Sequence, residues 1–251
     1  MTRPRGDSPP PGGRRPLIGV IGGLGPAATL DFYARVLEHT PAATDHEHIR
    51  LLLDADPEVP DRNESVAGTG ASSAPALVAK ARRLKEAGAE LLVMPCNAAH
   101  AYRREIEAAV RLPFVSIVDE ALKEAIALAP SALKVGILAT TGTLGAGLYQ
   151  RALADSGRAA VTLEGDRLAA FMRLIYRVKA ADNGADVGQE MVDHGRALVA
   201  AGAQALIAAC TEVPLALRAA EDARLGVPLI DATEALARAV VRLGSVAPKA
   251  G

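Results

Sequence analysis

The chain has two cysteines, and their local sequences resemble each other. Cys96 ends the segment AGAELLVMPC at 87–96, and Cys210 ends the segment AGAQALIAAC at 201–210. The two segments align without a gap and share five identical residues. Each cysteine follows a short apolar run that is typical of a buried strand, and each is followed by a polar residue. Two cysteines at equivalent strand ends could act together on one small molecule.

Such a pair has three possible roles. A free cysteine usually packs as a small apolar side chain, and a disulfide requires an oxidising compartment. A thiolate can also remove a proton from carbon while a thiol on the opposite side delivers another, which inverts the stereocentre. Each sulfur would approach the carbon to about 3–3.5 Å, so we expect the two sulfurs about 7 Å apart, too far for a disulfide.

The segments around the cysteines also repeat, at an offset near 115 residues. IGVIGG from residue 18 parallels VGILAT from residue 135, and LPFVS from residue 112 parallels VPLI from residue 227. Short apolar runs alternate with longer stretches of helical spacing, which predicts parallel sheets covered by helices. We therefore expect an α/β fold with two pseudo-symmetric lobes. Each lobe is a parallel sheet flanked by helices, and the active site lies in the cleft between them.

The repeat sets the expected domain boundaries. The first lobe spans 17–130 and the second 131–245, and the C-terminal helix could pack on the first lobe. Residues 1–16 lack an apolar centre, so we expect a disordered tail rather than a secretory signal, and 246–251 form a second tail. The predicted strands are 17–22, 48–53, 91–95, 114–117, 134–139, 205–209 and 229–231. The predicted helices are 27–39, 76–87, 101–110, 147–155, 166–180, 184–201 and 232–243.

Composition excludes several function classes. The chain has 28 Lys and Arg against 29 Asp and Glu, a net charge of −1, and only 3% aromatic residues. It therefore lacks both the basic excess and the stacking residues of a nucleic-acid-binding protein. No run approaches the roughly 18 apolar residues of a membrane span. We expect neither nucleic acid nor membrane as a partner, and a soluble cytoplasmic protein with reduced thiols.

Glycine- and threonine-rich turns follow the first strand of each repeat. Gly23-x-Gly25-x-x-Ala28 formally fits a dinucleotide fingerprint, but the acidic residue expected about 20 positions further on is missing. The better interpretation is a turn whose backbone N–H groups, that of Gly23 included, face a carboxylate. Thr140, Thr141 and Thr143 occupy the equivalent turn of the second repeat, where they could cap a helix, bind an anion, or do both. Of the three, Thr141 and Thr143 are the expected ligands.

Charged and histidine residues near the cysteines suggest further roles. Glu212 is two residues after Cys210, where its charge would raise the pKa of the thiol and favour a proton donor, although a structural hydrogen bond is an equal alternative. His100 lies one helical turn after Cys96 and could support its thiolate or bond to the backbone. The segment DHEH at 45–48 has no third histidine nearby, so we expect no metal.

Five ordered motifs resemble those of the aspartate/glutamate racemase family, the cofactor-independent amino-acid racemases. The motifs are GGLGPAAT at 22–29, PDR at 60–62, MPCNAAH at 94–100, GILATTGT at 136–143 and CTEVPL at 210–215. The resemblance runs from residue 17 to about residue 243. It implies two pseudo-symmetric lobes, Cys96 and Cys210 as the catalytic bases, no cofactor, an amino-acid substrate and a homodimer.

The resemblance also implies residues that bind the substrate. Asn97 and Thr211 would hold the α-carboxylate and the ammonium group. Arg62 and Lys179 resemble residues that bind an acidic side chain.

The chain departs from the family pattern at three places. Ala98 stands where the family usually has a threonine hydroxyl. Asp56, with Asp54 nearby, precedes the PDR motif and would repel a substrate side-chain carboxylate. The spacing between a tyrosine and Lys179 is short. The sequence therefore indicates an amino-acid racemase more strongly than it indicates aspartate as the substrate.

Two other functions remain open. A related two-cysteine enzyme could isomerise or decarboxylate a dicarboxylate with one cysteine as nucleophile. A non-catalytic amino-acid-binding or regulatory protein could have kept the cleft, and Ala98 favours this alternative most. Lys179 is not expected to hold pyridoxal phosphate, because neither a phosphate cradle nor a partner for the pyridine nitrogen can be placed.

Overall fold

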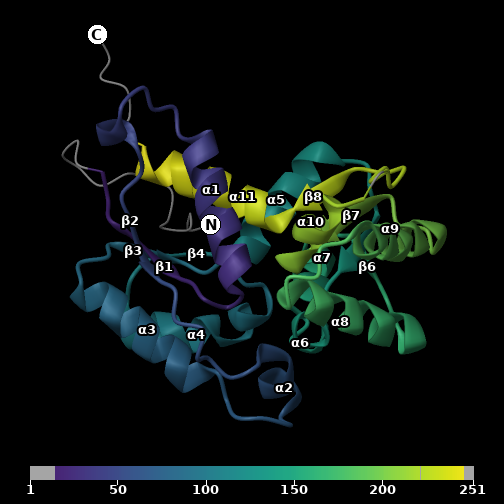
Figure 1. The fold of residues 1–251 in the computed structure, drawn as a ribbon, viewed down its shortest axis with the longest axis horizontal. Helices are drawn as coiled ribbons and strands as arrows, with labels where there is room; N and C mark the ends of the chain where they lie inside the picture. Colours follow the sequence, from purple (N-terminus) through teal and green to yellow (C-terminus); the bar gives the residue numbers. More distant parts are fainter. Residues whose placement is uncertain (1–14, 221, 246–251) are drawn as a thin grey trace.

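The computed structural model contains two four-stranded parallel sheets (Figure 1). It describes residues 15–220 and 222–245, so most of the predicted tail at 1–16 and all of the tail at 246–251 lie outside the described residues. The strand order is β2-β1-β3-β4 in the first sheet and β6-β5-β7-β8 in the second, with every pair parallel. The two sheets share one topology, and the predicted α/β class is confirmed.

The strands are short and end where the sequence pattern placed them to within a few residues. Their bounds are β1 (Ile18–Ile21), β2 (Leu51–Asp54), β3 (Leu91–Val93), β4 (Phe114–Val115), β5 (Lys134–Leu138), β6 (Ala159–Thr162), β7 (Ala205–Ala208) and β8 (Leu229–Asp231). The prediction missed β6, an edge strand that pairs with β5 and stays partly exposed. An edge strand of this kind lacks the continuous apolar run that marks a buried one.

Alternate residues of the central strands face opposite sides of each sheet. Val135 and Ile137 of β5 join an apolar cluster that both lobes share. Gly136 faces the other way, where a Cβ would lie 3.1 Å from the Cβ of Leu198. Gly19 has the same place in β1, where a Cβ would lie 3.3 Å from that of Leu84. The glycine common to IGVIGG and VGILAT therefore lets a helix approach the sheet closely.

The helices fill the connections between the strands. Their bounds are α1 (Pro26–His39), α2 (Arg62–Ala67), α3 (Ala74–Glu86), α4 (Arg103–Val110), α5 (Ile117–Leu128), α6 (Thr141–Gly145), α7 (Leu148–Asp155), α8 (Gly165–Lys179), α9 (Ala185–Ala200), α10 (Glu212–Leu217) and α11 (Ala232–Gly244), with 3₁₀ turns η1 (Asp45–Glu47) and η2 (Ala98–Tyr102). Pro26 occupies the first turn of α1, as its missing N–H predicts. The prediction missed α2, α5, α6 and α10.

The helices divide among three apolar clusters. Residues of α3 and α4 pack on one face of the first sheet, and residues of α8, α9 and α10 pack on one face of the second. Residues of α1, α5, α7 and α11 form the third cluster together with both sheets. The C-terminal helix α11 packs against α1 and α5 of the first lobe, and it runs from the middle of the molecule out over that lobe (Figure 1). The third cluster therefore fixes the two lobes relative to each other.

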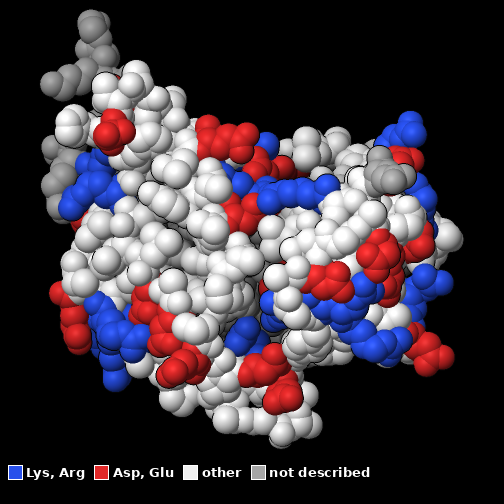
Figure 2. All heavy atoms as spheres, in the orientation of Figure 1, with Lys and Arg blue, Asp and Glu red and all other residues white. Residues whose placement is uncertain are grey.

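The face shown in Figure 2 carries acidic and basic side chains that are mixed rather than gathered by sign. This distribution agrees with the net charge of −1. None of the helices in 15–220 and 222–245 combines the length and the apolar character that crossing a bilayer requires.

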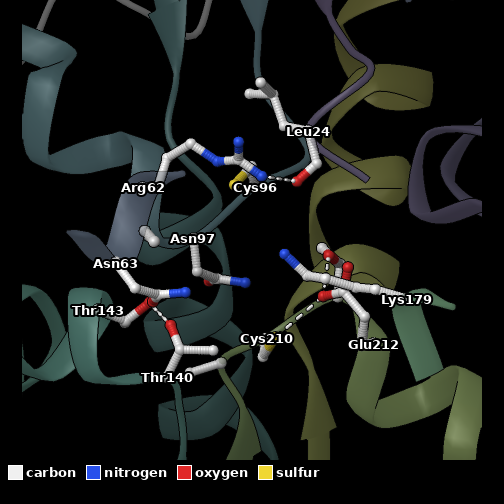
Figure 3. Close-up of a pocket in the computed structure, with 13 residues that line it drawn as sticks. Leu24, Arg62, Asn63, Cys96, Asn97, Thr140, Thr143, Lys179, Cys210 and Glu212 are labelled. Carbon is white, nitrogen blue, oxygen red and sulfur yellow. Dashed lines mark hydrogen bonds between the residues drawn. The ribbon is translucent and has the colours of Figure 1, made fainter. Parts of the chain in front are cut away.

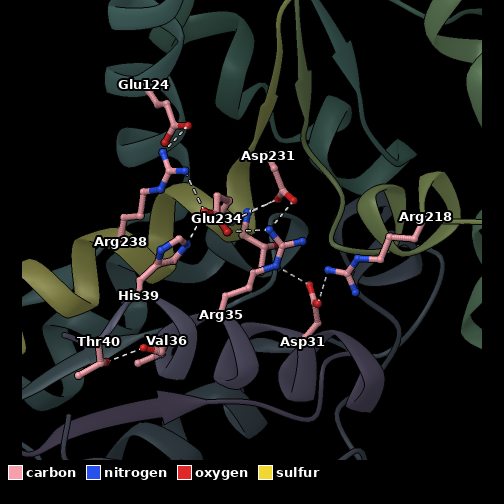
Figure 4. Close-up of polar contacts among 11 residues, drawn as sticks. Asp31, Arg35, Val36, His39, Thr40, Glu124, Arg218, Asp231, Glu234 and Arg238 are labelled. Carbon is pink, nitrogen blue, oxygen red and sulfur yellow. Dashed lines mark hydrogen bonds and ion pairs between the residues drawn. The ribbon is translucent and has the colours of Figure 1, made fainter. Parts of the chain in front are cut away.

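A charged cluster joins α1 to the start of α11 (Figure 4). Arg35 Nε lies 2.8 Å from Asp31 Oδ2, and Arg35 Nη1 lies 2.8 Å from Asp231 Oδ2 and 2.9 Å from Glu234 Oε2. Asp231 also caps α11 by accepting hydrogen bonds from the backbone N–H groups of Thr233 and Glu234. One guanidinium thus holds three carboxylates from the two halves of the chain.

Substitution of this arginine tests the cluster. We expect Arg35→Met to lower the free energy of unfolding by about 2–4 kcal/mol, because it leaves largely buried carboxylates without their shared cation. Denaturant titration measures the loss. Arg104→Met, at an exposed position, is the matched control and should change stability by less than about 0.5 kcal/mol. Equal losses in the two variants would show that the cluster does not join the lobes.

His194 is a buried histidine in the second lobe. Its ring packs edge-on against Phe171 with 5.4 Å between the centroids, and neither ring nitrogen has a hydrogen-bond partner within the described part of the chain. Burial lowers the pKa of His194 to about 4. The folded protein therefore keeps this ring neutral under conditions in which the unfolded chain protonates it.

The low pKa predicts a pH-dependent stability. The unfolded chain binds a proton at this histidine near pH 6.5, whereas the folded state binds it only near pH 4, so stability falls as the pH drops through that window. His194→Phe keeps the ring contact and removes the proton, which should retain up to about 3 kcal/mol more stability at pH 4. Urea titrations between pH 4 and 7 give the slope of unfolding free energy against pH for wild type and for His194→Phe. Identical slopes for variant and wild type would contradict the prediction.

Candidate functional site

Both cysteines line one pocket between the two lobes (Figure 3). Cys96 follows β3 of the first sheet and Cys210 follows β7 of the second, so the two thiols come from equivalent strand ends. Both are buried and neither is in a disulfide. The space among the lining side chains is about 300 Å³, including its opening to solvent. Both cysteines therefore border one shared space.

Most residues that the sequence assigned to the substrate lie at this pocket. Six of the eight line it, namely Arg62, Asn97, Thr143, Lys179, Thr211 and Glu212. Gly23 and Thr141, both described by the structure, lie outside it. The pocket also contains residues that the sequence interpretation did not single out as ligands, namely Leu24, Asn63, Ala98, Thr140 and Ala209.

Gly23 serves the turn rather than a ligand. Its N–H donates a hydrogen bond to Thr29 Oγ1 at 2.9 Å, which corrects the prediction that this N–H faces a carboxylate. Its φ is +80°, and a Cβ here would lie 2.3 Å from the carbonyl oxygen of Asp56. Glycine is therefore required for backbone shape, and the next residue, Leu24, reaches the pocket in its place.

The threonine turn of the second lobe is shifted by one residue from the prediction. Thr141 is exposed, and its backbone N–H lies 3.3 Å from Met172 Sδ. Thr140 lines the pocket instead, with its Oγ1 3.4 Å from Thr143 Oγ1. Thr140 is the N-cap residue of α6, but its side chain makes no capping hydrogen bond. Thr140 and Thr143 therefore present their hydroxyl groups together at the pocket.

Asp54 and Asp56 do not repel a ligand in this pocket. Asp54 pairs with Lys80 at 2.9 Å and with Arg83 at 2.7 Å, and Asp56 Oδ2 lies 3.4 Å from the same arginine. Neither aspartate lines the pocket. The repulsion predicted from their sequence position is therefore wrong, because α3 supplies cations that pair with both carboxylates.

Glu212 contacts Cys210 directly. The Cys210 thiol and the Thr211 hydroxyl both donate to Glu212 Oε2, each at 3.0 Å, and Glu212 is only 4% exposed. Burial, together with the charge of Glu212, raises the pKa of Cys210 well above its usual value. Cys210 is therefore held as a thiol, as the sequence predicted. The structural hydrogen bond and the raised pKa result from the same contact.

Arg62 is anchored to the backbone at the edge of the pocket. Its Nη1 donates to the carbonyl oxygens of Val59 and Pro60, each at 3.1 Å, and its Nη2 donates to that of Leu24 at 2.9 Å. These bonds hold the guanidinium in one place, half-buried in the pocket wall. An anchored cation can bind an anion without first losing side-chain entropy.

Lys179 reaches the pocket from the end of α8 in the second lobe. The residue as a whole is exposed, but its ammonium group points toward the middle of the pocket, 5.7 Å from the ring centroid of Tyr176 (Figure 3). Burial of the ammonium opposes its charge, but Glu212 and the cysteines outweigh this effect and raise the pKa of Lys179. It is therefore a cation at neutral pH. The short Tyr-to-Lys spacing does not keep it from the pocket.

Asn97 presents an unused donor. Its Oδ1 accepts a hydrogen bond from the Tyr149 hydroxyl at 2.6 Å, while its Nδ2 has no hydrogen-bond partner among the residues that the structure describes. The side chain is 2% exposed, and its Nδ2 end points into the pocket (Figure 3). Buried donors are rarely left without an acceptor. The adjacent Ala98 adds no polar group.

His100 supports the backbone at Cys96 rather than the thiol. Its Nε2 accepts from the N–H of Ile117 at 3.2 Å, so its Nδ1 carries the proton and donates to the carbonyl oxygen of Cys96 at 2.8 Å. Burial lowers the pKa of His100 to about 4. Of the two roles that the sequence left open, the backbone hydrogen bond is therefore the one observed.

Asn63 joins the two lobes at the pocket. Its Oδ1 accepts from the N–H of Gly142 at 3.1 Å, and its Nδ2 donates to the Tyr176 hydroxyl at 3.1 Å. A Cβ at Gly142 would lie 2.9 Å from Asn63 Oδ1, so the glycine permits this contact. The sequence offered one signal for Asn63, its position directly after the PDR motif.

Within 15–220 and 222–245, no three His, Cys, Asp or Glu side chains are grouped as metal ligands would be.

Comparisons with known proteins agree with this geometry. Residues 21–240 match a family model described as Asp/Glu/Hydantoin racemase. The chain is 25% identical to the broad specificity amino-acid racemase RacX of Bacillus subtilis (strain 168), over 90% of this chain and 96% of that protein. It is 28% identical to the structure of Picrophilus torridus aspartate racemase, with a TM-score of 0.74 over 90% of this chain and 93% of that one. Glutamate racemase of Francisella tularensis in complex with D-glutamate, at 16% identity and a TM-score of 0.67 over 91% of this chain and 80% of that one, shares the fold.

The contact between Glu212 and Cys210 predicts a change in thiol reactivity. Glu212→Gln keeps the side-chain size and removes the charge that raises the pKa of Cys210, so more thiolate forms near pH 8. Iodoacetamide should then alkylate Cys210 roughly tenfold faster if its pKa falls by one. Peptide mass spectrometry after timed alkylation gives the rate at each cysteine.

Cys96 is the internal control for this experiment, because Glu212 accepts its hydrogen bonds from Cys210 and Thr211 and not from Cys96. Its alkylation rate should stay within about twofold of wild type. Equal acceleration at both cysteines would show a loosened pocket rather than a charge effect, and an unchanged rate at Cys210 would contradict the prediction.

Proposed function

Because the chain belongs to the Asp/Glu/Hydantoin racemase family, we propose that it is an amino-acid racemase that works without a cofactor and moves protons between Cys96 and Cys210. The observation that carries the proposal is one pocket lined by two free, buried cysteines from equivalent strand ends. One thiolate removes the α-proton, and the thiol on the other side of the carbon delivers a proton. Inversion of the α-carbon follows.

Cys210 holds a proton at the start of the proposed reaction. Its thiol donates to Glu212, and its raised pKa favours the protonated state. In this state Cys96, as thiolate, takes the α-proton of one enantiomer while Cys210 gives its proton to the opposite face. For the other enantiomer the two cysteines exchange roles. Both thiols must therefore reach the same carbon. A pocket between two similar lobes gives each of them access to it.

We further propose that the substrate is an acidic amino acid. Arg62 and Lys179 both line the pocket, and each can pair with a carboxylate. A substrate with a side-chain carboxylate offers these two cations a second anionic group, which a neutral amino acid lacks. The Picrophilus torridus relative is an aspartate racemase by its description, whereas RacX is described as having broad specificity. Aspartate and glutamate are therefore the first substrates to test. A homodimer stays a prediction from the family resemblance, and a cytoplasmic location stays a prediction from the sequence.

Isotope exchange tests the proposed reaction. Incubation of the protein with L-aspartate or L-glutamate in D₂O should place deuterium on the α-carbon and end in a racemic mixture. Cys96→Ala and Cys210→Ala should each lower the racemisation rate by about 10²–10⁴-fold, the contribution of a positioned acid or base. Proton NMR follows the exchange and chiral chromatography follows the enantiomers. Ser131→Ala, at an exposed position outside the pocket, is the control and should keep the wild-type rate.

Other results would replace the proposal. Exchange that survives in Cys96→Ala would exclude that thiol as the base. A covalent adduct on a cysteine, seen by mass spectrometry, would indicate nucleophilic isomerisation or decarboxylation. Thermal stabilisation by amino acids, without exchange at any α-carbon, would indicate a binding protein.

A further inference from the structure

A buried tyrosine from the second lobe reaches the asparagine beside Cys96. Tyr149, on α7, is 0% exposed and belongs to the apolar cluster that both lobes share. Its hydroxyl donates to Asn97 Oδ1 at 2.6 Å. The remaining donor of that amide, Nδ2, points into the pocket without a hydrogen-bond partner in the described chain (Figure 3).

We propose that Tyr149 is a positioning residue that fixes the side-chain amide of Asn97, so that Asn97 Nδ2 donates a hydrogen bond to a carboxylate oxygen of the substrate. This inference rests on the proposed function for the identity of the ligand. It assigns Tyr149 no contact with the substrate. Its effect passes through Asn97 alone.

The orientation of the amide follows from the surroundings of the tyrosine. A side-chain amide can present either its oxygen or its nitrogen to a hydroxyl group. Tyr149 is a buried member of the shared apolar cluster, and Asn97 Oδ1 is the acceptor that the structure gives its hydroxyl. Burial raises the pKa of Tyr149 well above its usual value, so the phenol keeps its proton. If the amide turned over, that proton would lose its acceptor at a buried site, which is costly. The oxygen therefore faces Tyr149 and the nitrogen faces the pocket.

One buried hydrogen-bond donor at the pocket lacks an acceptor that a carboxylate could supply. A buried N–H group without an acceptor costs free energy until an acceptor arrives. Asn97 Nδ2 is such a group, and it lies in the residue directly after Cys96. Ala98 offers no hydroxyl at the next position. A carboxylate bound by Nδ2 would therefore lie beside the thiol of Cys96, with a strong, charge-assisted hydrogen bond holding it.

The contact also crosses between the lobes. Asn97 belongs to the first lobe, at the start of η2, and Tyr149 belongs to α7 of the second. The donor that faces the ligand is therefore oriented only when the two lobes are packed together. This arrangement makes the direction of Asn97 a property of the whole fold.

Tyr149→Phe removes the hydroxyl and keeps the buried ring. We expect its KM for L-aspartate or L-glutamate to rise about tenfold, the effect of one misdirected hydrogen bond, with a smaller change in kcat. Asn97→Ala should raise KM at least as much. The double variant should have the KM of Asn97→Ala alone, because Tyr149 acts through the amide. Tyr102→Phe, which removes a hydroxyl bonded to Ser65 outside the pocket, is the matched control and should keep the wild-type KM.

Calorimetric titration with L-aspartate and L-glutamate separates this inference from the proposed function. If wild type binds either amino acid but racemises neither, the proposed function fails. The Kd values of wild type, Tyr149→Phe, Asn97→Ala and the double variant then still test the role of Tyr149. Additive losses in the double variant, or wild-type affinity in Tyr149→Phe, would overturn the positioning role. Binding of neither amino acid by wild type would overturn both proposals. Asn97→Asp gives a second test. It keeps an acceptor for Tyr149 but removes the donor, so it should fold and still lose affinity.

Discussion

Burial of one apolar cluster between two sheets is the constraint on which the pocket depends. Strands β1, β5 and β7 direct alternate side chains into it, and α1, α5, α7 and α11 close it. Because these helices come from both halves of the chain, the cluster cannot form unless the two lobes pack together. Packing at interior density leaves little freedom of relative placement. The strand ends that carry Cys96 and Cys210 are thereby held at one pocket.

Symmetry of the backbone does not extend to the charges. Cys210 has a carboxylate from Glu212 at hydrogen-bond distance, whereas the equivalent position two residues after Cys96 is Ala98. One cation reaches the pocket from each lobe. Arg62 is fixed by backbone carbonyl groups, and Lys179 lies at the end of α8. Two similar lobes therefore supply two thiols in unlike environments. That difference favours the protonated state at Cys210, whose thiol donates to Glu212.

Several polar groups at the pocket depend on partners distant in the sequence. The Asn97 amide is oriented by Tyr149, and Asn63 meets both Gly142 and Tyr176 across the lobes. Neutral His100 links the backbone of Cys96 to the start of α5. Such groups are placed by the packing of whole helices rather than by their own segments. These polar side chains are therefore held in fixed directions by their partners. Asn97 Nδ2, which has no partner among the described residues, is left free to bind a ligand.

The sequence by itself determined the duplication, the parallel sheets and the two cysteines at strand ends. The spacing of apolar residues and the repeated segments are local features that can be read directly from the sequence. It also indicated six residues of the pocket. Only the tertiary structure decided which neighbour of a turn faces inward, so Leu24 and Thr140 replaced Gly23 and Thr141. It also decided that α3 pairs with the charges of Asp54 and Asp56, and that Asn63 completes the pocket. Side-chain direction and partners far along the chain fix these features, and a single sequence records neither.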